Sequence, residues 1–269
     1  MSARAIETVY VRARDDVRIG ARRSGETGRA LVFVHGVGST ASIWDAQLST
    51  FGIDFRCAAV ELRGNGAFED PDPSLITRAT FAADVLDVCD ALRFERLTLV
   101  GCSLGGVVGF ELWGRARNRI DAMAIVGSFA RYPSGERYAS DVCTAVIEAG
   151  DMRTFATNRA SKLNLPPTRL AETIEQMACK SVPCYLASTR ATWTGDYRPV
   201  LPTIDVPVLV LCGERDAIAP LALSEEIASG VAGATLAVVE DAGHVANADA
   251  PARFNGLLRD FLAASVGVA

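Results

Sequence analysis

The sequence predicts an α/β fold, namely a mostly parallel eight-stranded sheet flanked by helices, with a helical cap inserted between strands six and seven. Short β-branched apolar runs alternate with helical patterns along the chain. Four of these runs are apolar on both faces, which is typical of parallel strands buried between two layers of helices. The alternation is interrupted once, between residues 131 and 200, where no convincing strand occurs.

The apolar runs have the length of ordinary strands. We expect strands at residues 6–13, 18–23, 30–35, 55–61, 97–102, 122–126, 206–212 and 235–239. Apolar residues at helical spacing predict a helix over about residues 81–92, with Thr77 or Thr80 as its N-cap. Asp249 and Pro251 predict the start of the last helix, because these residue types favour an N-cap and a first turn.

The segment 131–200 consists of helix-like pieces punctuated by prolines. We therefore expect a core domain formed by residues 1–130 and 201–269, and a helical cap formed by residues 131–200. The cap leaves the sheet after the sixth strand and returns before the seventh. That position places it over the carboxyl ends of the strands, where ligands bind in open α/β sheets.

Composition excludes several classes of protein. The 269 residues carry a net charge of −5 without a basic run, so nucleic acid is not an expected partner. No apolar run is long enough for a signal peptide or a membrane span, so we expect a cytoplasmic protein. Seven cysteines without CxxC spacing argue against a disulfide framework and a structural zinc site, and we expect no metal or cofactor. The oligomeric state stays open, a homo-oligomer included.

Ser103 stands out as a candidate nucleophile. It is the serine of a G-x-S-x-G run, Gly101-Cys102-Ser103-Leu104-Gly105, which a buried strand precedes and an apolar helical pattern follows. This context is that of a nucleophile elbow, a sharp turn that exposes the serine hydroxyl. Side chains at 101 and 105 are expected to collide with the neighbouring helix and strand. A tight turn with an incidental serine is the alternative.

A serine nucleophile needs a base, and the chain has two histidines, His35 and His244. A carboxylate must then orient the imidazole. Glu214 and Asp216 both follow the buried strand at 206–212, so both qualify by location. The turn after the preceding strand offers only glycine and serine at 127 and 128.

These motifs together resemble the α/β-hydrolase superfamily over nearly the whole chain. Within it, the sequence is most similar to bacterial enol-lactonases of the 3-oxoadipate type and to related small-cap serine esterases. The resemblance is carried by residues 101–109, by 196–202 and by Ala242-Gly243-His244. Two positions depart from the pattern: Cys102 replaces the usual Leu, His, Asn or Met, and Asn65 replaces the commoner His.

The resemblance implies roles for individual residues. The order nucleophile, acid, histidine selects His244 as the base, because only His244 follows Ser103. Asp216 matches the acid of the G-x-x-D pattern, with Glu214 as the alternative. His35 then belongs to a structural His-Gly loop, and the backbone N–H groups of Val37 and Leu104 form the oxyanion hole.

Four further residues are expected to bind the substrate: Gly36, Arg131, Arg159 and Trp193. The expected substrate is a small carboxylic ester or lactone, cleaved through an acyl-enzyme on Ser103. An arginine of the cap would recognise a lactone that carries a carboxylate, because a buried carboxylate needs a charge-assisted partner. The alternatives are hydrolysis of carbon–carbon bonds in ring-cleavage products, and a ligand receptor that performs no catalysis.

Overall fold

The computed structural model describes residues 5–65, 70–161, 165 and 167–265. Eight strands form one sheet in the order β1-β2-β4-β3-β5-β6-β7-β8. The two pairings made by β2, with β1 and with β4, are antiparallel, and all the other pairings are parallel. The predicted fold class, an eight-stranded and mostly parallel sheet, is confirmed.

All eight predicted strands occur, with ends that differ by at most two residues. They are β1 (Glu7–Arg12), β2 (Arg18–Ser24), β3 (Ala30–Val34), β4 (Arg56–Glu61), β5 (Leu97–Cys102), β6 (Ile120–Val126), β7 (Val208–Gly213) and β8 (Thr235–Val239). In β3, β5 and β7 every residue is buried, as expected for strands covered on both faces.

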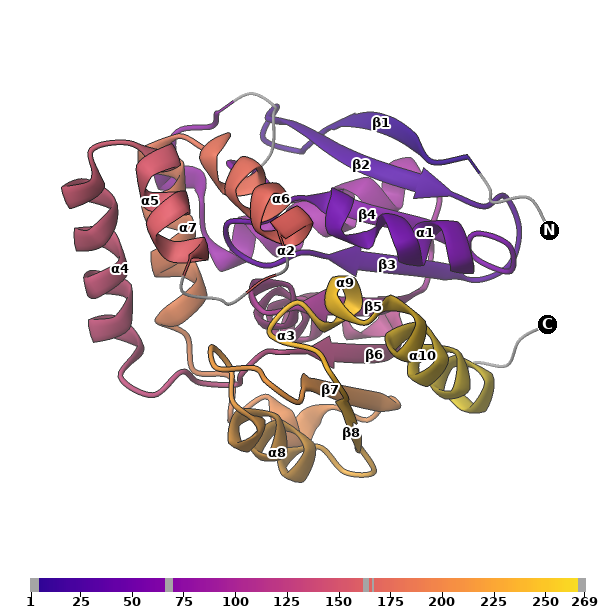
Figure 1. Ribbon diagram of the computed structural model, residues 1–269. Helices are drawn as coiled ribbons and strands as arrows, with labels where there is room; N and C mark the ends of the chain where they lie inside the picture. Colours follow the sequence, from indigo (N-terminus) through magenta and orange to yellow (C-terminus); the bar gives the residue numbers. More distant parts are fainter. Residues whose placement is uncertain (1–4, 66–69, 162–164, 166, 266–269) are drawn as a thin grey trace.

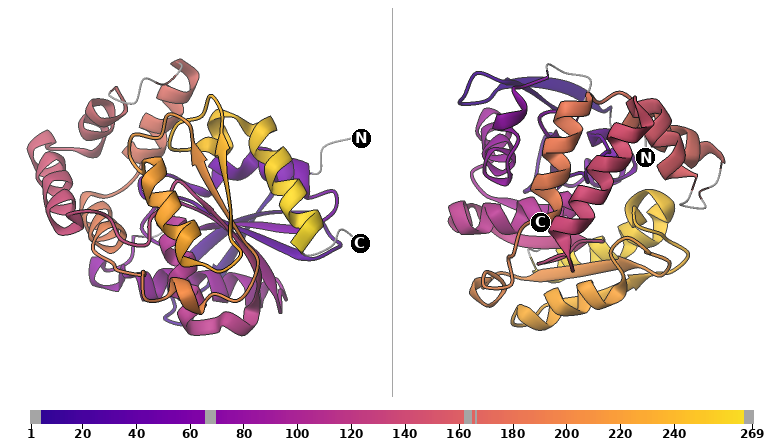
Figure 2. Two further views of the ribbon diagram at one scale, coloured as in Figure 1. Left: turned by 90° about the horizontal axis from the view of Figure 1, so that it is seen from below. Right: turned by 90° about the vertical axis from the view of Figure 1, so that its left-hand side faces the viewer.

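Helices cover both faces of the sheet (Figures 1 and 2). Helices α1 (Asp45–Phe51) and α10 (Pro251–Ser265) pack on one face, and α2 (Arg78–Ala91), α3 (Leu104–Ala116) and α8 (Leu221–Gly230) pack on the other. An apolar core lies on each face of the sheet, and successive side chains of each central strand pack alternately into one core and the other, because strand side chains alternate between faces. A short helix, α9 (Ala246–Asp249), precedes α10. Helix α2 begins at the predicted cap: Thr77 and Thr80 form a reciprocal capping box.

Four helices are inserted between β6 and β7, as predicted, and Figure 1 shows them gathered at one end of the sheet. They are α4 (Gly135–Ala149), α5 (Met152–Ala160), α6 (Pro167–Ala178) and α7 (Val182–Trp193). The two ends of the insertion meet at an isolated antiparallel bridge between Arg131 and Asp196. The division into a core and a cap at residues 131 and 200 stays a prediction.

In the described residues, no helix has the length and apolar character needed to cross a membrane. All seven cysteines are free thiols, and six of them are buried.

Candidate active site

Ser103 lies at the junction of β5 and α3, in a left-handed backbone conformation with φ 55° and ψ −116°. Such a conformation is strained for a residue other than glycine, so the surrounding structure must enforce it. The backbone of Ser103 is fixed on both sides: its N–H donates to the carbonyl of Val126 at 2.9 Å, and its carbonyl accepts from Ser128 Oγ at 2.8 Å. The turn therefore presents the Ser103 side chain at the carboxyl end of the sheet.

The two outer glycines of the motif are required by close backbone contacts. A Cβ on Gly101 would lie 2.3 Å from the carbonyl oxygen of Gly105 in α3. A Cβ on Gly105 would lie 2.1 Å from the carbonyl oxygen of Val34 in β3. Both distances are far below van der Waals contact, as the sequence predicted for these positions.

His244 and Asp216 form a hydrogen-bonded pair. The Nδ1 atom of His244 lies 2.9 Å from Asp216 Oδ2 and 3.0 Å from Oδ1. Asp216 Oδ1 also accepts from the N–H groups of Ile218 and Ala219, each at 2.9 Å, so the buried carboxylate is held in one orientation. Since a carboxylate can only accept, Nδ1 carries the proton and Nε2 is left as the acceptor that a base requires.

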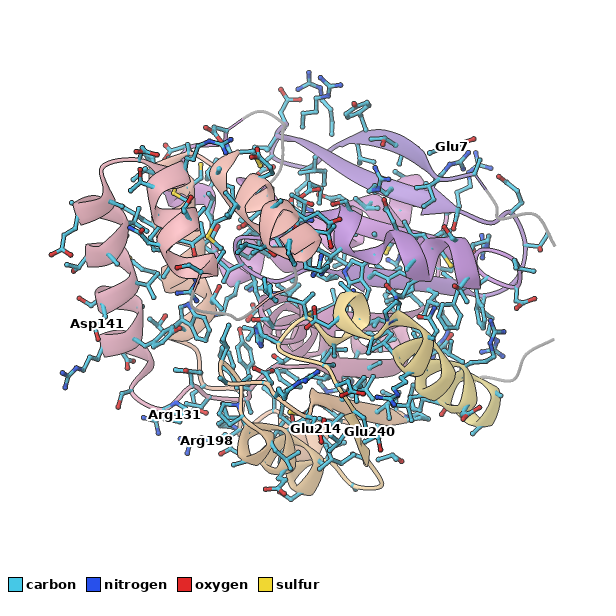
Figure 3. All side chains as sticks on the ribbon, viewed as in Figure 1. Glu7, Arg131, Asp141, Arg198, Glu214 and Glu240 are labelled. Atoms are coloured by element: carbon cyan, nitrogen blue, oxygen red, sulfur yellow. The ribbon has the colours of Figure 1, made fainter. Side chains whose placement is uncertain are left out.

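The other two candidates are occupied elsewhere. The Glu214 carboxylate accepts from the N–H of Asp241 at 3.0 Å and does not contact His244, and Figure 3 labels Glu214 near β8. His35 is fully buried, and its Nε2 accepts from the N–H of Leu62 at 3.1 Å. The same Nε2 lies 3.2 Å from Glu61 Oε1, and Nδ1 lies 2.8 Å from the carbonyl oxygen of Gly36, so neither nitrogen of His35 is free.

A cavity of about 80 Å³ lies beside Ser103 and His244. The core contributes Gly36, Val37, Ser103 and His244 to its lining, and the cap contributes Arg159 and Trp193. Trp193 is fixed by an aromatic cluster, with ring centroids 4.6 Å from Tyr132, 4.6 Å from Tyr138 and 5.1 Å from Phe129.

Arg131, the remaining residue that was expected to bind the substrate, lies away from the cavity. Arg131 is exposed and does not line the cavity, because it belongs to the bridge where the insertion meets the core. Figure 3 labels it at the lower rim of the molecule, beside Arg198.

Two backbone amides are available at the predicted oxyanion hole. Among the described residues, neither the N–H of Val37 nor that of Leu104 has a hydrogen-bond acceptor. Leu104 begins α3, where the positive end of the helix dipole favours negative charge. Gly36 lets the loop approach the serine, because a Cβ there would lie 3.1 Å from Ser103 Cβ.

No motif in the sequence singles out the polar wall of the cavity. It consists of Arg169, Thr173 and Gln176, which follow one another at helical spacing on one face of α6. The same spacing is typical of any solvated helix face, so only the fold shows that this face points into the site. Cys102 also lines the cavity; burial raises the pKa of its thiol, which therefore stays protonated.

Known proteins are similar to this chain in sequence and in fold. The putative carbamate hydrolase RutD of Yersinia enterocolitica is 25% identical over 257 residues, covering 92% of each chain. The 3-oxoadipate enol-lactonase 2 of Acinetobacter baylyi is 26% identical over 248 residues, covering 89% of this chain and 91% of the relative. The crystal structure of the enol-lactonase from Burkholderia xenovorans superposes with a TM-score of 0.85 at 28% identity, covering 94% of this chain and 99% of that one.

The predicted resemblance to 3-oxoadipate enol-lactonases is thus confirmed at the level of distant relatives. The model of the alpha/beta hydrolase family matches residues 31–257, which is most of the chain. The protein belongs to the alpha/beta hydrolase family.

Proposed function

We propose that the protein hydrolyses small carboxylic esters or lactones, with Ser103 as nucleophile, His244 as base and Asp216 as the acid that orients it. One observation carries the proposal: the hydrogen-bonded His244–Asp216 pair opens onto the same cavity as the serine of a strained strand-to-helix turn. A buried acid, a histidine and a serine arranged in this way are the parts of a hydrolytic triad.

The reaction follows from this arrangement. Ser103 Oγ attacks the substrate carbonyl while His244 Nε2 takes the hydroxyl proton. The oxyanion of the tetrahedral intermediate accepts from the free N–H groups of Val37 and Leu104. His244 returns the proton to the leaving alkoxide, which leaves an acyl-enzyme on Ser103. Water then attacks the acyl-enzyme ester while His244 takes its proton, and His244 returns this proton to Ser103 Oγ as the bond to the acyl group breaks and the acid product leaves.

The size of the cavity limits the substrate. A volume of about 80 Å³ is far smaller than the several hundred Å³ of pockets that hold drug-sized ligands. The substrate must therefore be compact when the cap helices lie as they do here, which suits a small ester or a single lactone ring.

Arg159 indicates that the substrate carries a carboxylate. It is half-buried at the cavity, and among the described residues its one hydrogen bond is a long one of 3.4 Å to the hydroxyl of Tyr138. In the described part of the chain, no carboxylate pairs with Arg159. Arg169, the other arginine of the cavity, is neutralised by Glu172 at 2.7 Å and Asp249 at 3.6 Å. Arg159 is therefore the cation left to bind an anionic group.

Substitution of Arg159 tests this assignment. Loss of one charge-assisted hydrogen bond is expected to raise KM for an acidic lactone about 10- to 100-fold in Arg159→Gln. The KM for a neutral ester such as p-nitrophenyl acetate should change by less than about 3-fold, because a neutral ester has no anionic group for Arg159 to bind. Arg131→Gln is the matched control, since Arg131 is a cap arginine outside the cavity, and it should behave like the parent. Equal changes for both substrates would contradict the carboxylate assignment and leave a plain esterase.

The same assay separates the alternative functions. A hydrolase of carbon–carbon bonds would prefer a dienone ring-cleavage product over every ester and lactone in the panel. A receptor would turn over none of them, and an organophosphonate would leave Ser103 unlabelled.

A further inference from the structure

The carboxylate of Asp249 lies between the turn that carries His244 and the cap helix α6. Its Oδ2 accepts from the N–H of Gly243, the residue before His244, at 3.0 Å. Its Oδ1 lies 3.6 Å from Nε of Arg169, which projects from α6 and lines the cavity. Both side chains are largely shielded from water, with 13% of Asp249 and 19% of Arg169 exposed. One carboxylate thus contacts the cap and the backbone beside the proposed base.

The remaining contacts of this turn come from the core. The carbonyl of Ala242 accepts from the N–H of Arg215 at 2.8 Å, and Gly213 packs directly against the carbonyl of Gly243. These contacts are backbone contacts to the end of β7, so they do not change when the cap moves. Asp249 is different because its charged partner belongs to the cap.

The distance of 3.6 Å between Arg169 Nε and Asp249 Oδ1 is longer than a hydrogen bond and can shorten. Arg169 Nε is buried, yet it has no hydrogen-bond acceptor among the described residues. A buried N–H without an acceptor is unfavourable, and an approach of less than 1 Å by α6 would let it donate to Asp249 Oδ1. Arg169 also forms part of the cavity wall, so a shift of α6 towards Asp249 would move that wall as well.

Helix α6 is attached to the core in a way that permits such a movement. Met177 is the one buried residue of α6 in the described part of the chain, and the apolar cluster that it joins is formed by residues of α4, α5 and α7, so the buried apolar contacts of α6 lie mainly within the cap. Its links to the loop after β3 are an apolar contact of Met177 with Gly38 and two hydrogen bonds of Gln176. Gln176 Oε1 accepts from Ser39 Oγ at 3.0 Å, and Gln176 Nε2 donates to Ser42 Oγ at 3.3 Å. Elements with few buried apolar contacts are those that open and shift most readily.

We propose that Asp249 is a positioning residue for His244, and that the Arg169–Asp249 contact couples the seating of α6 over the substrate to the alignment of the base. The inference rests on the function proposed above. When α6 approaches, Arg169 fixes the Asp249 carboxylate, which fixes the Gly243 N–H and with it the backbone of His244. Closure of α6 over the substrate thereby completes the alignment of the base.

The test is a double-mutant cycle on p-nitrophenyl acetate with Arg169→Gln, Asp249→Asn and the double variant. Asp249→Asn keeps an oxygen acceptor for Gly243 and removes the charge that faces Arg169. Each single variant should lower kcat about 10-fold, and the double variant should lose no more than the worse single one, because both changes break one contact. KM should stay within about 3-fold of the parent, since the effect is on the base and not on substrate binding.

Arg153→Gln is the matched control. It removes an exposed ion pair of 2.7 Å with Glu175 that joins α5 to α6 away from the cavity, and it should leave kcat unchanged. Melting temperatures of all variants check that the fold is intact.

Three results would overturn the coupling: kcat unchanged in both single variants, losses that add in the double variant, or losses confined to acidic substrates, which would make Arg169 a substrate-binding group. The proposed function fails separately. In that case the activity of the parent survives Ser103→Ala, whereas a failure of the coupling alone leaves activity that depends on Ser103 but not on Arg169.

Discussion

At Gly105, helix α3 packs so closely against strand β3 that there is no room for a side chain. Replacement of Gly105 by alanine therefore tests the geometry of the β5–α3 turn that carries Ser103. The added Cβ would lie 2.1 Å from Val34 O and 2.7 Å from Val34 C, both atoms of the backbone. The contact is more than about 1 Å too short, so helix and strand must separate. Gly114 lies in the same helix and offers the opposite case, since nothing lies within 4 Å of a Cβ built there.

The two substitutions are chemically identical but should have effects of opposite sign. Overpacking costs about 1–3 kcal/mol, and a backbone clash belongs at the upper end, while alanine gains up to about 1 kcal/mol in helix propensity. Gly105→Ala should therefore lower the free energy of unfolding by about 2 kcal/mol, which corresponds to a fall of about 4–8 °C in Tm. Gly114→Ala should raise Tm by about 1–4 °C.

Thermal unfolding followed by circular dichroism measures both effects, and esterase turnover below the transition adds a second readout. Gly105→Ala should lose more activity than its folded fraction explains, because Gly105 adjoins the Leu104 amide of the proposed oxyanion hole. Gly114→Ala should keep the activity of the parent. A Gly105→Ala variant as stable and active as the parent would refute the strand-to-helix packing on which the site depends.

Three further predictions address the chemistry. Ser103→Ala should fold normally and lose activity by about 10⁴-fold or more, and an organophosphonate should label Ser103 in the parent; retained activity would reject the nucleophile. Asp216→Asn should lower kcat/KM by about 10³- to 10⁴-fold through the wrong histidine tautomer, whereas Glu214→Gln should cost less than about 10-fold; similar small losses would place the acid elsewhere. Burial raises the pKa of the Cys102 thiol, so its thiolate fraction is low at every ordinary pH. Iodoacetamide at pH 7–8 should thus modify the exposed Cys179 and spare Cys102, and comparable labelling of both would contradict this assignment.

The sequence predicted the sheet closely because its signals are local. The strand at 97–102 has the bounds of the observed β5, since a buried apolar run followed by glycine leaves little choice. The predicted start of β6, at residue 122, lies two residues after the observed one. Ile120 pairs with Leu97, but Asp121 interrupts the apolar run with a carboxylate that bonds to Arg96 at 2.5 Å. Because Asp121 is paired with Arg96, which lies far from it in the sequence, a search for apolar runs misses the first two residues of β6.

The residues of the cavity wall could not be predicted, because they depend on which face each cap helix presents to the core. Arg131 and Arg159 look alike in the sequence, yet one lies in the exposed bridge and the other lines the cavity. Asp249 shows the same limit. The sequence indicates a cap for the last helix, but the carboxylate instead accepts from Gly243 and faces Arg169. Both outcomes are set by contacts between residues that no short-range spacing connects.

The bridge between Arg131 and Asp196 makes the insertion a closed loop on the core. The N–H of Tyr197 also donates to the carbonyl of Ala130 at 2.8 Å, so the chain leaves and returns at adjacent points. The entropy of closing such a loop changes slowly with its length, by about 0.6 kcal/mol for each doubling. The entropy of loop closure therefore sets little limit on the length of the segment between the two points. A different cap segment joined at this bridge would give the cavity a new wall and leave the proposed catalytic residues of the core unchanged. In this way one scaffold can bind different substrates.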